Sequence, residues 1–130
     1  MQGLSDAEKK GFGRAGEDLA AQFLRSRGYQ ILEKNYRCRL GEIDLIVQDG
    51  KNQDIHFVEV KTRHSVASVS PYELVPYGKQ RRISRAAQHY IAAKRLGDVS
   101  ADFAVLIVDY SQGSPQFELI ENAFPLAWGF

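Results

Sequence analysis

Three charged side chains stand within two apolar segments that should form buried strands. Asp44 lies in the segment 43–47, and Glu59 and Lys61 lie in the segment 55–61. An unpaired buried carboxylate is strongly unfavourable, so carboxylates in such places are usually paired or bound to a metal. Two carboxylates suit Mg²⁺, and a nearby lysine can orient water or stabilise charge on a phosphate. The alternative is an ordinary ion pair between Lys61 and Glu59 on a half-exposed sheet face.

Strand geometry predicts that these three residues share one face. Glu59 and Lys61 are two residues apart, which puts their Cα atoms about 6–7 Å from each other on the same side. A turn centred on residues 51–52 places Asp44 opposite Glu59, because directly paired residues point the same way. A tight turn at residues 49–50 would leave Asp44 on the same face as Glu59 and Lys61 but would pair it with a different residue of the second strand. The spacing therefore predicts a cluster of two carboxylates and a lysine.

The helix that precedes these strands carries a further acid. The sequence predicts a helix that is firm over residues 13–27, after a capping-box pattern at residues 5–8. Glu17 falls on one helical line with Gly13, Ala20, Ala21 and Leu24. It should therefore lie on the inner edge of the helix, where it can add to a metal site. Pairing in solvent with Arg14 or Arg25 is the alternative.

The other segments complete an alternating α/β pattern. We expect a strand at 29–35, loops at 36–40 and 64–78, a helix from Pro76 or Tyr77 to Leu96 closed by Gly97, and strands at 103–110 and 116–121. In the strand around Asp44, alternation places on one face Ile43, Leu45 and Val47, and on the other Asp44 and Ile46. Asp102 is expected to form a cap or an ion pair. The order α-β-β-β-α-β-β predicts one α/β domain over residues 1–130, with a central mixed sheet flanked by helices.

Basic residues are segregated from acidic ones along the chain. Residues 1–95 hold all 17 Lys and Arg, whereas residues 96–130 hold acids and no base. The start of the second helix holds four basic residues, Lys79, Arg81, Arg82 and Arg85. Positive charge near a helix N-terminus is unfavourable to the helix dipole and costs about 0.3–1 kcal/mol of stability for each residue. A phosphate-binding surface explains this better than a solvated basic face or surface pairing of the two ends. The predicted nucleic-acid contacts are Arg14, Arg37, Arg39, Arg63, Lys79, Gln80, Arg82 and Arg85. On the second helix, Lys79 and Gln80 are expected to approach the cleft that holds the carboxylates, and the other basic residues to touch the nucleic-acid backbone.

An ordered set of motifs resembles a known protein family. The motifs are GRAGE at residues 13–17, GY at 28–29, NYR at 35–37, GEIDLI at 41–46 and FVEVKTR at 57–63. The set, which runs from about residue 13 to 110, resembles the YraN family of small bacterial endonuclease-like proteins. Asp44 followed by Glu59-Val60-Lys61 resembles the core of the PD-(D/E)xK nucleases, which include restriction endonucleases and Holliday junction resolvases. Two features depart from the pattern: Ile43 stands where proline is usual, and the 64–78 loop is longer.

The resemblance implies a restriction-endonuclease-like core and a role for each acidic residue. It implies a Mg²⁺- or Mn²⁺-dependent endodeoxyribonuclease that hydrolyses phosphodiester bonds of branched or structured DNA, as a homodimer. Asp44, Glu59 and the Val60 carbonyl would hold the metal, and Lys61 would position or polarise the attacking water. Glu17 would bind a second ion or orient water. The expected catalytic residues are therefore Glu17, Asp44, Glu59 and Lys61.

Composition limits the remaining function classes. The 130 residues are 44% hydrophobic and 25% charged, which is typical of a globular domain. No apolar run approaches the ~18 residues that a membrane helix needs. The single cysteine, Cys38, and the lack of a signal-peptide pattern favour a cytoplasmic protein. Two alternatives to an enzyme are a nucleic-acid-binding or adaptor protein that keeps the nuclease fold, and an interaction module that uses the apolar tail around Trp128.

Overall fold

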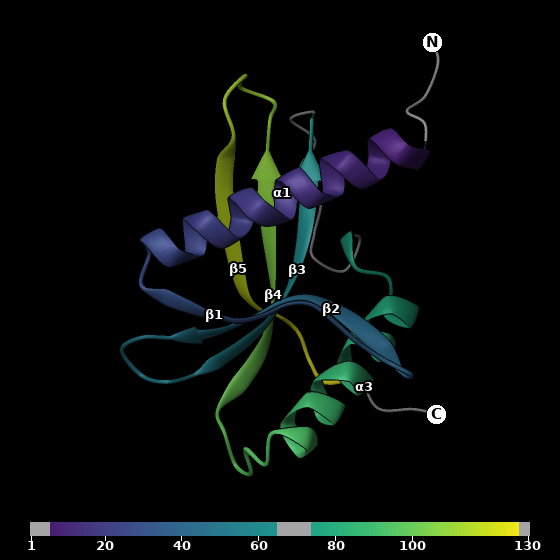
Figure 1. The fold of residues 1–130 in the computed structure, drawn as a ribbon, viewed down its shortest axis with the longest axis vertical. Coiled ribbons are helices and arrows are strands. Elements are labelled where there is room, and N and C mark those ends of the chain that lie inside the picture. The colour runs from purple at the N-terminus through teal and green to yellow at the C-terminus, as the bar shows by residue number, and fades with distance from the viewer. Residues whose placement is uncertain (1–5, 65–73, 128–130) are drawn as a thin grey trace.

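Among the described residues, two helices and five strands follow the order expected from the sequence. The computed structural model describes residues 6–64 and 74–127, with side chains from residue 15 onward, so most of the expected 64–78 loop lies outside the described residues. The elements in Figure 1 are α1 (Asp6–Ser26), β1 (Tyr29–Cys38), β2 (Gly41–Asp49), β3 (Ile55–Arg63), α3 (Tyr77–Ala93), β4 (Ala101–Asp109) and β5 (Gln116–Phe124). This order confirms the predicted α/β class. Neither α1 nor α3 combines the length and the apolarity that a membrane crossing needs.

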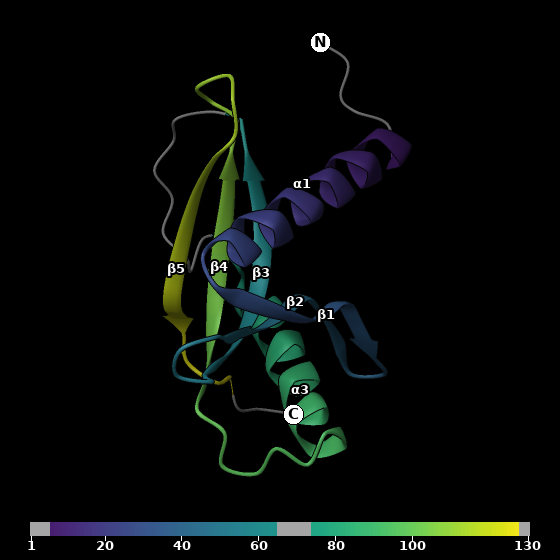
Figure 2. The same ribbon diagram turned by 60° about the vertical axis from the view of Figure 1, so that its left-hand side comes forward.

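The strands form one mixed sheet in the order β1-β2-β3-β4-β5. β3 and β4 are parallel, whereas the other neighbouring pairs are antiparallel. A parallel pair needs a long crossover connection, which is why α3 stands between β3 and β4 in the sequence. Figure 1 and Figure 2 show β1 and β2 turned steeply away from the other three strands, as a strongly twisted sheet requires.

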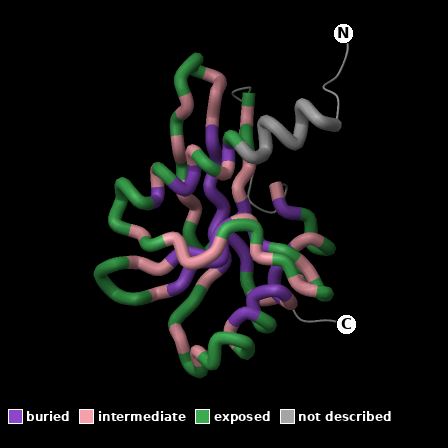
Figure 3. Tube along the Cα trace, in the orientation of Figure 1, coloured by how far each residue is buried: buried purple, intermediate pink, exposed green. Residues whose placement is uncertain are grey.

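Each helix covers its own face of this sheet. Leu24 of α1 lies in one buried cluster with Leu106 of β4, and Ile83 of α3 lies in a second cluster with Val105. Neighbouring residues of a strand point to opposite faces, so the two helices lie on opposite sides of β4. Figure 3 shows the buried residues concentrated along the central strands between these layers.

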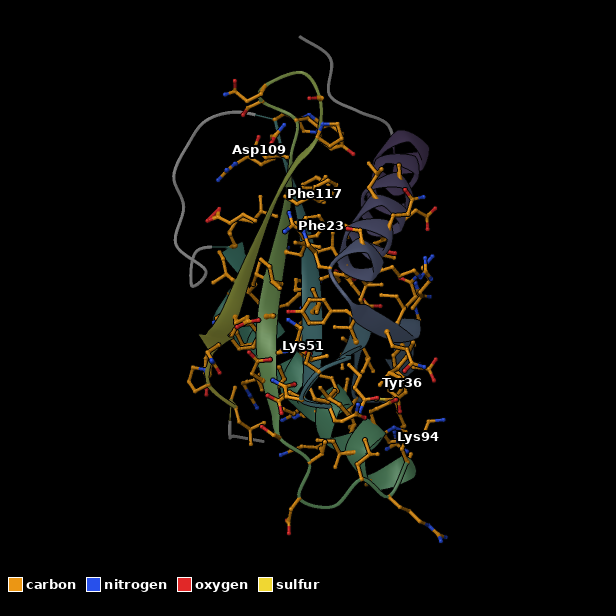
Figure 4. The ribbon with its side chains drawn as sticks, turned by 90° about the vertical axis from the view of Figure 1, so that its left-hand side faces the viewer. Phe23, Tyr36, Lys51, Lys94, Asp109 and Phe117 are labelled. Carbon is orange, nitrogen blue, oxygen red and sulfur yellow. The ribbon has the colours of Figure 1, made fainter. Side chains whose placement is uncertain are left out.

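The last strand reaches further than the sequence pattern predicts. β5 continues to Phe124, which is buried and stacks on Phe103 of β4 with ring centroids 5.1 Å apart. Nearer its start, Phe117 stacks on Phe23 of α1 at 4.6 Å, as Figure 4 shows. Aromatic pairs of this kind add about 0.5–1.5 kcal/mol beyond their burial. β5 therefore packs against α1 near its start and against β4 near its end.

α3 ends at Ala93, earlier than the predicted end at Leu96. Arg95 has a left-handed φ of 54°, and its N–H donates to the Ala92 carbonyl at 3.2 Å. The Leu96 N–H donates to the Ile91 carbonyl at 3.0 Å. These two bonds form a Schellman motif, which closes the last turn. Glycine is the usual residue in that conformation, so the sequence rule selects the glycine two positions later.

The hairpin of β1 and β2 is longer than expected. β1 extends to Cys38, where it pairs with Gly41 of β2, although the sequence predicts that the strand ends at Asn35. Arg37 consequently lies in a strand and not in the loop expected at residues 36–40. The connection is reduced to a two-residue turn.

Alternation along β2 is interrupted beside Asp44. Ile43 joins Ile46 in the cluster under α3, whereas Leu45 lies in the cluster under α1. The prediction that Ile43 shares a face with Leu45 is therefore wrong. In the neighbouring strand, Asn35 has a left-handed φ of 52°, and Asn35 and Asp44 are not among the residue pairs of the regular ladder between β1 and β2. A left-handed residue rotates the chain out of the simple two-residue repeat.

A histidine–aspartate pair joins the starts of β3 and β4. The Nδ1 of His56 hydrogen-bonds to the Asp102 carboxylate, whose second oxygen accepts the Asn122 N–H at 2.8 Å. Asp102 therefore forms the ion pair that was one of its two predicted roles. The hydrogen bond with Asp102 raises the pKa of His56, against the opposing effect of burial, so folding favours the charged imidazole.

Stability from this pair should depend on pH. A histidine pKa raised above its ordinary value of 6.5 adds stability that is complete below that pH and is lost as the pH rises through the folded-state pKa. We expect His56→Gln to lower the free energy of unfolding by about 2 kcal/mol at pH 6 and by clearly less at pH 9. Urea denaturation at both pH values measures this, and an equal loss at both would contradict it.

Candidate active site

Asp44 and Glu59 lie close together just beyond the point where the ladder between β2 and β3 ends. The last regular pair is Leu45↔Val58, and continuing this register by one residue sets Asp44 against Glu59. The register also places the centre of the turn at residues 51–52, which is the first of the two turns considered from the sequence. The two carboxylates therefore stand at the point where the strands stop exchanging backbone hydrogen bonds.

The Asp44 side chain takes the place of a backbone acceptor. Its Oδ2 accepts the N–H of Val60 at 2.8 Å. The N–H and the C=O of one strand residue point toward the same neighbouring strand, so the Val60 carbonyl also faces Asp44. This hydrogen bond fixes the orientation of the Asp44 carboxylate before any ligand binds.

Glu59 is buried and forms two ion pairs through the same oxygen. Its side chain is 4% exposed, and its Oε1 lies 3.2 Å from the Nζ of Lys79 and 3.7 Å from the Nζ of Lys61. Lys61 follows in the same strand, whereas Lys79 comes from the first turn of α3. The ion pair with Lys61 exists, but the burial of Glu59 contradicts a half-exposed sheet face.

The surroundings of Glu59 shift its titration toward neutral pH. Burial and the negative charge of Asp44 raise the pKa of Glu59 to about 7, although Lys79 and Lys61 oppose this. Burial acts in this direction because a low-dielectric environment disfavours the charged form. Strongly perturbed carboxylates with a specific charged neighbour are concentrated at functional sites. Glu59 is therefore suited to exchange a proton for a cation near neutral pH.

Glu17 reaches the cluster from α1. The helix lies close to β3 at this point, since a Cβ added at Gly16 would come within 2.7 Å of the Thr62 Cγ2. Burial and the charge of Asp44 raise the pKa of Glu17, and a hydrogen bond with the Asn35 side chain partly offsets this. The structure thus brings all four predicted catalytic residues into one connected cluster.

The donors available to a metal ion are two carboxylates and one carbonyl. Mg²⁺ is usually held by one or two carboxylates together with water and substrate phosphates, so Asp44, Glu59 and the Val60 carbonyl fit this cation in kind. Within residues 15–64 and 74–127, no three His, Cys, Asp or Glu side chains gather into a metal site of their own. The set therefore suits an ion that shares its coordination with water and phosphate. Lys61 and Lys79 would compete with such an ion for the Glu59 oxygen.

Several of the residues predicted to contact nucleic acid have partners inside the protein, among them Lys79, Gln80 and Arg63. Lys79 belongs to the carboxylate cluster described above. Gln80 is 4% exposed, and its amide donates to the Val75 carbonyl at 2.8 Å. The Arg63 guanidinium pairs with Asp109 at 2.7 Å. Because burial leaves the Gln80 side chain little access to solvent, we do not include it in a nucleic-acid surface.

Three other predicted contacts gather at one place. Arg37, Arg39 and Arg82 line a surface pocket of about 290 Å³ between the β1–β2 hairpin and α3. Arg85 is half-buried further along α3, and the side chain of Arg14 lies outside the described residues. Lys79 therefore belongs to the carboxylate cluster, whereas Arg37, Arg39 and Arg82 form a separate group beside the hairpin.

Two residues of the cluster carry a role that the sequence did not predict. The sequence places Asn35 at the end of a strand and Lys79 near the cleft as a phosphate contact, whereas the structure connects Asn35 to Glu17 and pairs Lys79 with Glu59. The tolerance of asparagine for left-handed backbone is the signal that could have identified Asn35. No local signal could have identified the partner of Lys79, because that contact depends on how α3 packs.

Comparison with known proteins establishes the family. The model of the Uncharacterised protein family UPF0102 matches residues 16–120. The chain is 46% identical over 117 residues to a UPF0102 protein of Syntrophus aciditrophicus, which covers 90% of this chain and 91% of that protein. It is 47% identical over 119 residues to a UPF0102 protein of Geobacter metallireducens, with 92% and 96% covered. The chain therefore belongs to family UPF0102, which confirms the resemblance to the YraN family.

Proposed function

We propose that the protein is a metal-dependent endonuclease that hydrolyses phosphodiester bonds in branched or structured DNA. The observation that carries the proposal is the buried Glu59, which lies close to Asp44 and contacts two lysines. Binding of nucleic acid alone needs no buried carboxylates, because phosphate contacts depend on positive charge. The motif resemblance to PD-(D/E)xK nucleases and the mixed sheet support the same function.

Each residue of the cluster has a role in this proposal. When bound, Mg²⁺ or Mn²⁺ supplies a Lewis acid for the phosphate and lowers the pKa of a coordinated water. Asp44, Glu59 and the Val60 carbonyl would hold the ion. Lys61, whose side chain is 31% exposed, can orient the attacking water from the solvent side. Glu17 would orient water or hold a second ion. The cluster acts chiefly by electrostatic stabilisation of the reacting phosphate.

One observation favours a non-catalytic alternative. Lys61 and Lys79 already neutralise Glu59, so the buried charge is compensated without a metal ion. A protein that had lost turnover could retain such a cluster for stability and bind nucleic acid through its arginines. This adaptor function predicts DNA affinity that falls with salt and does not depend on Asp44.

Cleavage of labelled DNA separates the two functions. Linear, forked and four-way DNA are incubated with Mg²⁺, Mn²⁺ or EDTA and the native protein, Asp44→Ala, Lys61→Ala or the control Arg25→Ala, which changes an exposed residue of α1. We expect metal-dependent cutting by the native protein and the control, and none by the other two variants. Binding without cutting, equal in Asp44→Ala, would establish the adaptor function instead.

The resemblance to resolvases also leads us to propose a homodimer with two such sites. Sedimentation equilibrium tests this. If the protein is a monomer, the proposal of two paired cuts is excluded, whereas the proposed chemistry of a single site is unaffected. The alternative of an interaction module rests on Trp128, which lies outside the described residues. It predicts a dimer that dissociates on Trp128→Ala and shows no DNA affinity at low salt.

A further inference from the structure

The tip of the β1–β2 hairpin has an unusual composition for a tight turn. We define the hairpin tip as residues 38–41, where Cys38 pairs with Gly41 and Arg39-Leu40 form the turn. Two-residue hairpin turns usually contain Gly, Asn or Asp, because the favoured turn types need positive φ. Neither Arg39 nor Leu40 is among the described residues with positive φ. The turn backbone therefore does not require Gly, Asn or Asp, and it also does not account for the choice of arginine and leucine at these two positions.

The hairpin tip combines an apolar side chain with positive charge. Leu40 is 48% exposed, and among the described residues it and Tyr77 are the exposed large hydrophobic side chains. Arg39 stands beside it, and Arg37 and Arg82 line the same pocket of about 290 Å³. Glu42 offsets part of this charge through its contact with Arg37 at 3.5 Å. The remaining positive charge complements a polyanion, and exposed Leu40 complements an apolar surface such as the face of a base.

The hairpin tip is held in a fixed place relative to α3. A Cβ added at Gly41 would lie 2.1 Å from the carbonyl oxygen of Arg82, so the hairpin backbone lies directly against the helix backbone. Figure 2 shows this end of the hairpin projecting beside α3, away from β3, β4 and β5. The end of the tip at Gly41 is therefore packed directly against α3.

Its distance from the candidate active site can be expressed in nucleotides. Leu40 precedes Asp44 by four residues of nearly continuous strand. At about 3.3 Å per residue, the turn lies on the order of 10–13 Å from the Asp44 carboxylate. One DNA strand advances about 3.4 Å per nucleotide, so this span corresponds to about three to four nucleotides.

We propose that the hairpin tip is a wedge that binds the branch point of DNA. Leu40 packs against the base pair that a branch leaves unstacked, and Arg37, Arg39 and Arg82 bind the flanking phosphates. Proteins that kink DNA insert leucine and similar apolar side chains at base steps in this way. The proposal rests on the proposed nuclease function for the position of the cut, whereas recognition of the branch is independent of catalysis.

Binding without cleavage tests the recognition step. Fluorescence anisotropy in EDTA compares a fork, a four-way junction and a linear duplex of the same sequence. We expect the native protein to bind the branched DNAs about tenfold more tightly than the linear duplex. This ratio corresponds to roughly the free energy of one contact with a base. Leu40→Ser should lose this preference while keeping its affinity for linear DNA, and Arg39→Ala should weaken binding to all three. Arg25→Ala is the matched control, an exposed arginine in the last turn of α1, outside the hairpin.

Mapping of the cut tests the geometry. With Mg²⁺, the native protein should cut about three to four nucleotides from the branch point, and Leu40→Ser should cut at scattered positions. Circular dichroism checks that each variant is folded. Cutting with a branch preference that survives in Leu40→Ser would overturn the wedge but keep the nuclease. Leu40-dependent branch binding without cutting would overturn the nuclease but keep the wedge. Absence of DNA binding would overturn both.

Discussion

Asparagine in place of Asp44 should give a folded protein that no longer cleaves DNA. We expect metal-dependent cleavage to fall by about a thousandfold or more, because the substitution removes a charged metal ligand from a site that acts through electrostatic stabilisation. Asparagine retains an oxygen that can accept the Val60 N–H, so the local hydrogen bond is preserved. It also removes both the repulsion from Glu59 and the attraction to Lys79. Stability should therefore stay within about 1 kcal/mol of the native value.

Two measurements on one preparation check this prediction. Single-turnover cleavage of a forked substrate measures the loss of activity, and urea denaturation measures the free energy of unfolding. Asp98→Asn is a matched control, since Asp98 is an exposed acid in the connection between α3 and β4. It should leave both quantities unchanged. Cleavage by Asp44→Asn within tenfold of the native rate would show that Asp44 is not a metal ligand.

Methionine in place of Lys79 should change the pH dependence of both activity and stability. Lys79 is the nearer of the two lysines to Glu59, at 3.2 Å, and it helps to keep this buried carboxylate ionised. Without it, the pKa of Glu59 should rise above its present value of about 7. A carboxylate must be ionised to bind Mg²⁺, so at limiting Mg²⁺ the rise in cleavage with pH should move to higher pH. Lys61→Met should cause a smaller shift, because Lys61 lies 3.7 Å away.

Stability should respond in the corresponding direction. An acid whose pKa is raised by folding adds stability below its ordinary value of 4.5 and loses it as the pH rises through about 7. At pH 8, where Glu59 is charged, Lys79→Met should lower the free energy of unfolding by about 1–2 kcal/mol. This is less than the roughly 3–5 kcal/mol typical of a broken buried pair, because Lys61 remains and solvent reaches Lys79.

The contrast between two pH values gives the test. At pH 5, where Glu59 is mostly protonated, the same variant should lose much less stability than at pH 8. Urea denaturation without metal measures both, and cleavage at limiting Mg²⁺ between pH 6 and 9 measures the shift in activity. A loss of stability that is the same at pH 5 and pH 8 would mean that Lys79 contributes through packing and not through the charge of Glu59.

The proximity of Asp44 and Glu59 could be predicted because it depends on local rules. An even turn centred on residues 51–52 fixes which residues pair, and the alternation in β3 fixes the face of Lys61. Glu17 could be placed on the inner side of its helix because helical spacing sets the buried stripe of α1. These inferences need only the period of each element.

The errors arise where one residue leaves the regular repeat. Asn35 adopts a left-handed conformation beside the point where the alternation of β2 is interrupted, and Arg95 adopts one where α3 ends. Asparagine tolerates this conformation, which is a weak signal for Asn35, whereas arginine gives no such signal and glycine is far more common there. The contact between Lys79 and Glu59 could not be predicted for a different reason. It depends on how α3 packs against the sheet after a long connection, and no local pattern encodes that.

The hydrogen bond from the Val60 N–H to Asp44 makes one backbone amide a reporter of the site. In a ¹H–¹⁵N correlation spectrum, the Val60 signal should move when Mg²⁺ is added, because the ion withdraws charge from the carboxylate that this amide contacts. Neighbouring amides of β3 that bond only to backbone should move less. Metal occupancy can therefore be followed by nuclear magnetic resonance in the protein alone, without a DNA substrate.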